Sequence, residues 1–156
     1  HRSWCAHCIR GRAETHPHFR QPGSDLQIPE IHIDYCFMGK ADEHVAPKLV
    51  ARDRETRSTM AMVVREKGVS DGYPVKRILA FIRELGHEGK KIALKSDQES
   101  SANAILLRVA RDREGATLIT HSPVRSSGSN GIIERAIKEV EGQVRTTRQR
   151  WTPGPA

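Results

Sequence analysis

Three acidic residues, Asp34, Asp97 and Glu134, stand in local sequences that set them apart from the other carboxylates of the chain. Asp34 interrupts the apolar run 31–37, Asp97 follows the aliphatic run 92–94, and Glu134 lies near the start of an amphipathic segment. An aspartate inside a β-branched run is disfavoured in a strand and costly when it is buried without a partner. Carboxylates that converge can hold divalent metal ions for phosphoryl transfer on nucleic acid.

That chemistry needs only a few carboxylates. Cleaving or joining a phosphodiester requires an activated oxygen nucleophile and stabilisation of the charge on the leaving oxygen, and two Mg²⁺ ions about 3.5–4 Å apart supply both. Mg²⁺ prefers oxygen ligands and keeps several of its waters. We therefore predict that Asp34, Asp97 and Glu134 are catalytic and hold two Mg²⁺ or Mn²⁺ ions.

Each of the three acids also has a structural interpretation. Asp34 could be an exposed residue on the open face of an edge strand, but its apolar neighbours favour metal binding. Asp97 could be an N-cap or turn residue before a helix, and its own context leaves both interpretations open. Glu134, taken alone, is better explained by a solvated helix face with an i,i+4 pair to Lys138. The three argue for a metal site only together.

The hydrophobic pattern indicates which elements must position these acids. The segment 53–56 is a polar tight turn and predicts a hairpin, while the later alternation of strands and helices predicts parallel pairing. We expect an α/β fold of the ribonuclease-H-like type: a mixed five-stranded sheet, three antiparallel strands followed by two parallel ones, flanked by helices. The first strand should be central with the fourth beside it. The predicted strands are 31–38, 49–52, 58–64, 91–95 and 116–119, and the predicted helices are 73–85, 99–113 and 131–148.

Four short motifs carry a resemblance to a known family. They are Ile33-Asp-Tyr35, Lys95-Ser-Asp-Gln-Glu99, His121-Ser-Pro123 and Asn130-Gly-Ile-Ile-Glu-Arg135. Together they resemble the catalytic core of retroviral and long-terminal-repeat retrotransposon integrases, and the spacing between the second aspartate and the glutamate also matches that family. The resemblance covers roughly residues 1–148, and its most specific part is the Asn-Gly-x-x-Glu-Arg segment with the upstream Ser-Pro.

The resemblance implies a role for each motif. Asp34 would bridge both metals, with Asp97 and Glu134 each holding one, for processing of DNA ends and then strand transfer. Asn130 and Gly131 would shape the loop before the catalytic helix. The same helix would contact DNA. The DNA-binding candidates are Asn130, just before this helix, Lys138, which matches a basic position of the family, and Arg145. Glu141 stands where the family can carry a second lysine.

The pair Cys5 and Cys8 has a Cys-x-x-Cys spacing that suits one end of a tetrahedral zinc site. Integrases carry a His-His-Cys-Cys module before the core, and this pair resembles its second half. Zn²⁺ binding would then need histidines upstream of His1. The alternative is a remnant that holds no metal. Cys36 is expected to be a buried structural thiol rather than a ligand.

Composition limits the remaining alternatives. The chain has 156 residues and a formal net charge of +7, which favours a polyanionic partner such as DNA, although a basic protein with no nucleic-acid role is the competing interpretation. No apolar run is long enough to predict a transmembrane helix.

We expect three segments along the chain: a zinc-module remnant and linker at 1–30, a catalytic core at 31–150 and a tail at 151–156. We also expect the protein to self-associate, to be intracellular and to act in the nucleus. Competing functions are a ribonuclease H, a DNA transposase, and a decayed or domesticated core that binds nucleic acid without catalysis.

Overall fold

The computed structural model describes residues 5, 28–38, 45–122 and 130–151. The elements follow in the order β1 (Glu30–Cys36), β2 (Lys48–Asp53), β3 (Thr59–Val63), α2 (Tyr73–Glu84), β4 (Ile92–Ser96), α3 (Ser100–Asp112), β5 (Thr117–His121) and α4 (Gly131–Trp151). Every predicted strand and helix is present, with its ends displaced by a few residues at most. None of the helices in this described part is long and apolar enough to cross a membrane.

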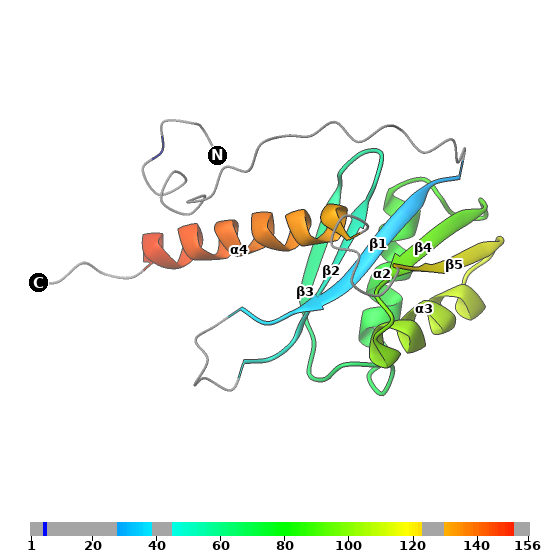
Figure 1. Cartoon of the computed structure of the whole chain (residues 1–156), viewed down its shortest axis with the longest axis horizontal. Helices are drawn as coiled ribbons and strands as arrows, with labels where there is room; N and C mark the ends of the chain where they lie inside the picture. The colour runs from blue at the N-terminus through cyan, green and yellow to red at the C-terminus, as the bar shows by residue number, and fades with distance from the viewer. Residues whose placement is uncertain (1–4, 6–27, 39–44, 123–129, 152–156) are drawn as a thin grey trace, which may run out of the picture.

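The five strands form one sheet in the order β3-β2-β1-β4-β5 (Figure 1). The β1–β2 and β2–β3 pairs are antiparallel, while β1–β4 and β4–β5 are parallel. The parallel pairs are joined by crossovers that contain α2 and α3, because parallel strands cannot be connected by a tight turn. The predicted ribonuclease-H-like α/β fold is confirmed, including the central place of β1 and the position of β4 beside it.

The two faces of the sheet are covered by different helices. Ile31, Ile33 and Tyr35 of β1 belong to the larger apolar core, which also contains residues of α2 and α3. Cys36 belongs to a second cluster that includes Ile133 of α4. Figure 1 shows α4 in front of the sheet and the other two helices behind it. Because side chains alternate along a strand, Asp34 lies on the same face of β1 as Cys36, the face that α4 covers.

Only the first half of α4 packs on the sheet. Ile133 and Ala136 are buried there, and Ile137 and Val140 pack against them. Val144 continues the helical spacing of these apolar residues, so the sequence predicts that it belongs to the same core stripe. It is instead 46% exposed, and Figure 1 shows that the far part of the helix extends past the sheet. The prediction for Val144 is therefore wrong, because the apolar stripe is longer than the surface it can cover.

The end of the sheet away from Asp97 is closed by a hydrogen-bonded arginine. The Arg113 guanidinium donates to the backbone oxygens of His87 (3.1 Å) and Lys90 (2.7 Å) in the α2–β4 connection. It also donates to residues of its own turn between α3 and β5, including the Thr117 hydroxyl at 2.7 Å. Gly115 in that turn has φ +92, and a Cβ there would lie 2.6 Å from the Gly89 oxygen. The two connections are thus packed backbone to backbone.

Candidate active site

The strand register brings Asp34 and Asp97 together. In the parallel β1–β4 pair, Ile31 is opposite Leu94 and His32 is opposite Lys95. Two residues beyond His32 and two beyond Lys95, this register places Asp34 opposite Asp97, which directly follows β4. This is the carboxyl end of two central parallel strands, where open α/β sheets hold their ligands. Because β1 is the middle strand, the edge-strand interpretation of Asp34 is wrong.

The surroundings of Asp34 disfavour its charge. Burial is the main reason that its pKa rises to about 6, and the negative charges of Asp97 and Glu99 raise it further. Two effects oppose this rise in pKa: the Tyr35 backbone N–H donates to Asp34 Oδ1 at 2.7 Å, and the Lys67 ammonium lies nearby. A half-buried carboxylate beside two others gains from a bound cation, because the cation offsets both the lost hydration and the mutual repulsion.

Asp97 has a structural role at the start of α3. Its Oδ1 accepts the backbone N–H of Glu99 at 3.0 Å, which is the turn role that its sequence also allowed. Its backbone oxygen is held by the Ser96 hydroxyl at 2.8 Å and faces His121 Nδ1 at 3.3 Å. These contacts orient the Asp97 carboxylate. They are compatible with metal binding, because an ionised carboxylate accepts at both oxygens.

Glu134 lies in the first turn of α4, and a short chain of hydrogen bonds ties that turn to the same end of the sheet. Ser122, which follows β5, donates its backbone N–H to the Ser96 oxygen at 3.0 Å. Its hydroxyl donates to Asn130 Oδ1, and the Asn130 backbone oxygen accepts the N–H of Glu134 at 3.0 Å. Asn130 therefore begins the helix and anchors it, while the Glu134 side chain is exposed.

The three predicted acids are gathered at one end of the sheet without forming a closed ligand set. Within the described residues, no group of three or more His, Cys, Asp and Glu side chains is close enough to hold a metal ion. The pair Asp34 and Asp97 still fits Mg²⁺ or Mn²⁺, since these ions take hard oxygen ligands and need only one or two carboxylates besides water and substrate oxygens. Both would hold the ion, and Glu134 would join them from the covering helix.

A fourth carboxylate at this end, Glu99, was not predicted as a site residue. Lys67, in the connection between β3 and α2, places its Nζ 2.6 Å from Glu99 Oε1. Burial of Glu99 opposes its ionisation, but hydrogen bonds from Lys67 and Ser101 hold its pKa below the ordinary value. The only sequence signal for Glu99 was its place two residues after Asp97. Nothing in the sequence pointed to Lys67, because its partner is distant along the chain.

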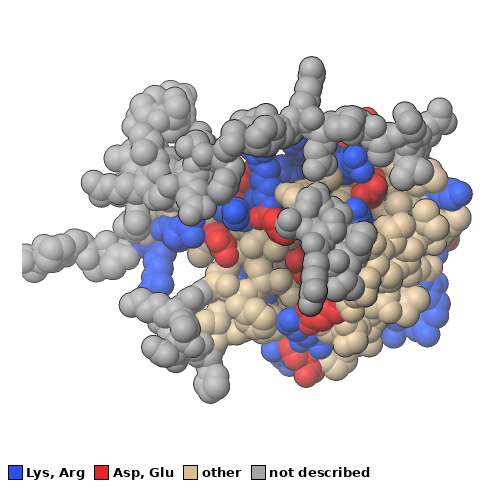
Figure 2. All heavy atoms as spheres, viewed as in Figure 1, with Lys and Arg blue, Asp and Glu red and all other residues tan. Residues whose placement is uncertain are grey.

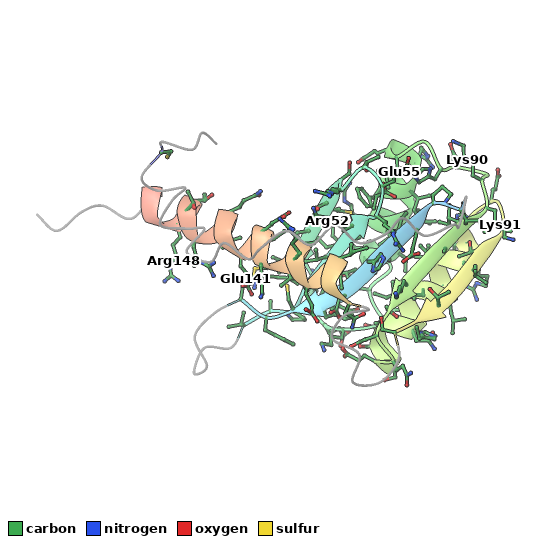
Figure 3. All side chains as sticks on the ribbon, turned by 45° about the horizontal axis from the view of Figure 1, so that its top comes forward. Arg52, Glu55, Lys90, Lys91, Glu141 and Arg148 are labelled. Carbon is green, nitrogen blue, oxygen red and sulfur yellow. The ribbon has the colours of Figure 1, made fainter. Side chains whose placement is uncertain are left out.

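The predicted DNA-binding residues of α4 lie along its solvent side. Lys138 and Arg145 are exposed, and Arg145 forms an i,i+4 ion pair with Glu141 at 3.7 Å. Figure 3 shows Glu141 and Arg148 on the same side of α4. On the face seen in Figure 2, basic and acidic side chains are interspersed, so the net charge does not gather there into a patch of one sign.

The cysteines fall into two classes. Cys36 is buried, and burial raises its pKa to about 11, with a smaller contribution from the charge of Glu141. Cys36 is thus the structural thiol that was predicted, because a neutral thiol is neither a nucleophile nor a metal ligand. Cys5 is half-buried, whereas Cys8 lies outside the described residues, so zinc binding stays a prediction.

Two histidines, the buried His32 and the partly buried His87, were also missed by sequence reasoning. His32 and Glu30 on β1 face each other, with Nε2 2.6 Å from Oε1, and Arg54 lies 3.3 Å from the other carboxylate oxygen. The His32 interaction is the main reason that the pKa of Glu30 falls to about 2. On the opposite face, His87 Nε2 lies 3.7 Å from Asp53 Oδ1. Both pairs lie toward the end of the sheet away from Asp97, so they are separate from the candidate site.

Comparison with known proteins gives a likeness of low identity. No protein-family model matches the sequence, and no curated protein matches it. Among solved structures, the chain is similar to one in the cryo-EM structure of the simian T-cell lymphotropic virus intasome in complex with PP2A regulatory subunit B56 gamma. The sequence identity is 11% and the TM-score 0.45, and the alignment covers 80% of this chain and 49% of that one. The chain thus spans about half the length of that structural neighbour.

Proposed function

We propose that this chain is a metal-dependent polynucleotidyl transferase core of the integrase type, which cuts and joins DNA phosphodiesters. The observation that carries the proposal is the placement of Asp34 and Asp97 at the carboxyl ends of adjacent parallel strands, beneath a helix whose first turn presents Glu134. The elevated pKa of Asp34 supports the proposal. A carboxylate that is buried beside other carboxylates destabilises the fold, and groups with such perturbed pKa values cluster at functional sites.

Each residue of the candidate site would have its own role. Asp34 and Asp97 would hold the cation at the sheet, and Glu134 would complete the site when the first turn of α4 closes over bound DNA. The bound metal would activate the attacking oxygen and stabilise charge on the leaving oxygen. Asn130 would set the position of Glu134 through its link to Ser122. Lys138 and Arg145 would contact backbone phosphates along α4.

The partners follow from this chemistry. On this proposal the substrates are the ends of a mobile element and target DNA, the place of action is the nucleus, and the protein works as an oligomer. A zinc ion at Cys5 and Cys8 would belong to an adjoining module rather than to the catalytic site.

The test is cleavage and joining of labelled oligonucleotide duplexes in Mg²⁺ or Mn²⁺, with Asp97→Asn as the variant. Asparagine keeps the oxygen that accepts the Glu99 N–H, so the turn before α3 survives while the charge is lost. Asp71→Asn is the matched control, because Asp71 Oδ1 also accepts a backbone N–H, that of Tyr73 at 3.0 Å. We expect the wild type and Asp71→Asn to be active and Asp97→Asn to lose at least about 100-fold, in line with the several kcal/mol that a catalytic metal supplies.

The same measurement separates the alternatives. Equal activity of Asp97→Asn and the wild type would refute the proposal. Tight DNA binding by an inactive wild type, with no effect of either metal, would instead identify a core that binds nucleic acid without catalysis. Cleavage restricted to RNA in an RNA–DNA hybrid would indicate a ribonuclease H.

A further inference from the structure

An exposed aromatic ring and a lysine stand together next to the acids. Phe37 directly follows β1 and is 57% exposed, so much of its ring is accessible to solvent. The Lys67 ammonium lies 5.1 Å from the centre of the Phe37 ring and 5.2 Å from that of Tyr35. Both distances are within the range of a cation–π interaction.

Lys67 is held in place from several directions. Its Nζ lies 2.6 Å from Glu99 Oε1. The neighbouring Gly68 donates its backbone N–H to the Tyr35 hydroxyl at 2.8 Å. The Tyr35 side chain is itself buried in the main core. An ammonium has three donors, and one pairs with Glu99, so Lys67 can still donate to an incoming phosphate without leaving its place.

This pair lies on one side of the acids, and α4 lies on the other. Asp34 is on the face of β1 that α4 covers, whereas Tyr35 is on the face packed by α2 and α3. Glu99, the partner of Lys67, begins α3 just beyond Asp97. A DNA strand whose scissile phosphate sits over Asp34 and Asp97 therefore passes from α4 on one side to Phe37 and Lys67 on the other.

We infer that Phe37 and Lys67 form a subsite for one unpaired nucleotide next to the scissile phosphate. The base stacks on the exposed face of the Phe37 ring, and its phosphate is neutralised by Lys67. Stacking on an aromatic side chain tolerates any base, so the subsite favours a frayed or single-stranded end over fully paired DNA without selecting a sequence. This inference rests on the proposed function for the path of the strand, but not for the contact itself.

A purely structural role is the competing explanation. Lys67 and Tyr35 could simply hold the β3–α2 connection against the end of β1. That structural contact depends on the buried Tyr35 ring far more than on the exposed ring of Phe37. The two explanations therefore differ in what the loss of Phe37 does to nucleic-acid binding.

The test measures binding of a fluorescent single-stranded oligonucleotide by anisotropy in EDTA, where no phosphoryl transfer occurs. A second oligonucleotide has the same phosphates but abasic sites. We expect the wild type to prefer the strand with bases, Phe37→Ala to lose that preference with about a tenfold drop in affinity, and Phe37→Tyr to keep it. Leu118→Ala, which trims another exposed apolar side chain, is the control and should bind as the wild type does.

The lysine is tested by salt dependence. Lys67→Gln should make the slope of log affinity against log salt less steep by about 0.7, the value for one phosphate of a single strand, whereas the exposed Lys76→Gln serves as the control. Equal binding of Phe37→Ala and the wild type, or equal binding of both oligonucleotides, overturns the inference. If Phe37→Ala is unfolded by circular dichroism, Phe37→Leu replaces it, since leucine keeps apolar bulk and lacks the ring. Because no metal is present, these outcomes are independent of whether the wild type proves to be a transferase.

Discussion

Replacing Asp34 by asparagine should stabilise the protein at neutral pH while it removes the proposed activity. The side chain is half-buried on the central strand, and its pKa is raised to about 6. Asparagine is nearly the same shape, is uncharged, and can still accept the Tyr35 N–H that now bonds Asp34 Oδ1. The substitution therefore removes the cost of the buried charge and keeps the local hydrogen bond.

The magnitude follows from the pKa. A rise from 3.8 to about 6 corresponds to about 3 kcal/mol, at about 1.4 kcal/mol for each unit. Because Asp34 is partly accessible to solvent, which screens its charge, we discount this by half and expect a gain of about 1.5 kcal/mol in the free energy of unfolding.

The gain should depend on pH in a defined direction. The folded wild type keeps the Asp34 proton up to about pH 6, and the unfolded chain only up to about pH 3.8. The folded state therefore binds more protons between these values, and wild-type stability falls as the pH rises through this window and levels off above it. Asparagine does not titrate, so the advantage of Asp34→Asn should be full near neutral pH and should vanish toward pH 4.

Urea unfolding followed by circular dichroism measures this difference at several pH values. The control is Asp71→Asn, which should change stability by less than about 0.5 kcal/mol, as surface substitutions usually do. Mg²⁺ should stabilise the wild type and not Asp34→Asn, because only a ligand that binds the folded state raises its stability. An Asp34→Asn protein that is less stable than the wild type at neutral pH would refute the electrostatic argument.

Three further predictions concern the scaffold. Gly115→Ala should lower the free energy of unfolding by about 2–4 kcal/mol, because φ is +92 and the new Cβ would meet the Gly89 oxygen; a midpoint unchanged in urea would contradict it. Arg113→Lys should lower the free energy of unfolding by about 2 kcal/mol in the same assay, since an ammonium cannot reproduce the guanidinium's bonds to both connections. Arg113→Ala is the comparison and should lower it further. Ser122→Ala should reduce DNA cleavage about tenfold with little change in melting temperature, because it frees Asn130 and the first turn of α4; unchanged cleavage would show that the link does not position Glu134.

The local elements could be predicted because their causes are local. Alternating β-branched residues, the polar turn after β2 and the glycine after α2 each act over a few neighbouring residues. Gly86 has φ +72 and donates its N–H to the Arg83 oxygen at 2.8 Å, which ends the helix where the sequence predicted. The order of connections then left few possible sheets, because parallel crossovers have one preferred handedness.

The burial of individual residues was less predictable, because it depends on how far one element overlaps another. The apolar stripe of α4 predicted a buried Val144, yet the sheet ends before that residue and leaves it half-exposed. His32 gave no signal in the sequence, although it lies buried against Glu30 in the structure. Spacing shows which face of an element is apolar, and it does not show how much of that face is covered.

The sequence by itself determined the strands and helices of this protein and the three acids of the candidate site, since residue type and spacing along the chain are enough for both. Only the tertiary structure decided that Asp34 is half-buried level with Asp97, and that Glu99, Lys67 and Phe37 stand beside them. The physical reason is that burial and charge interactions depend on distances through space. Residues 67 and 99 share no local pattern, and they become partners only when β1, β4 and the β3–α2 connection meet at one end of the sheet.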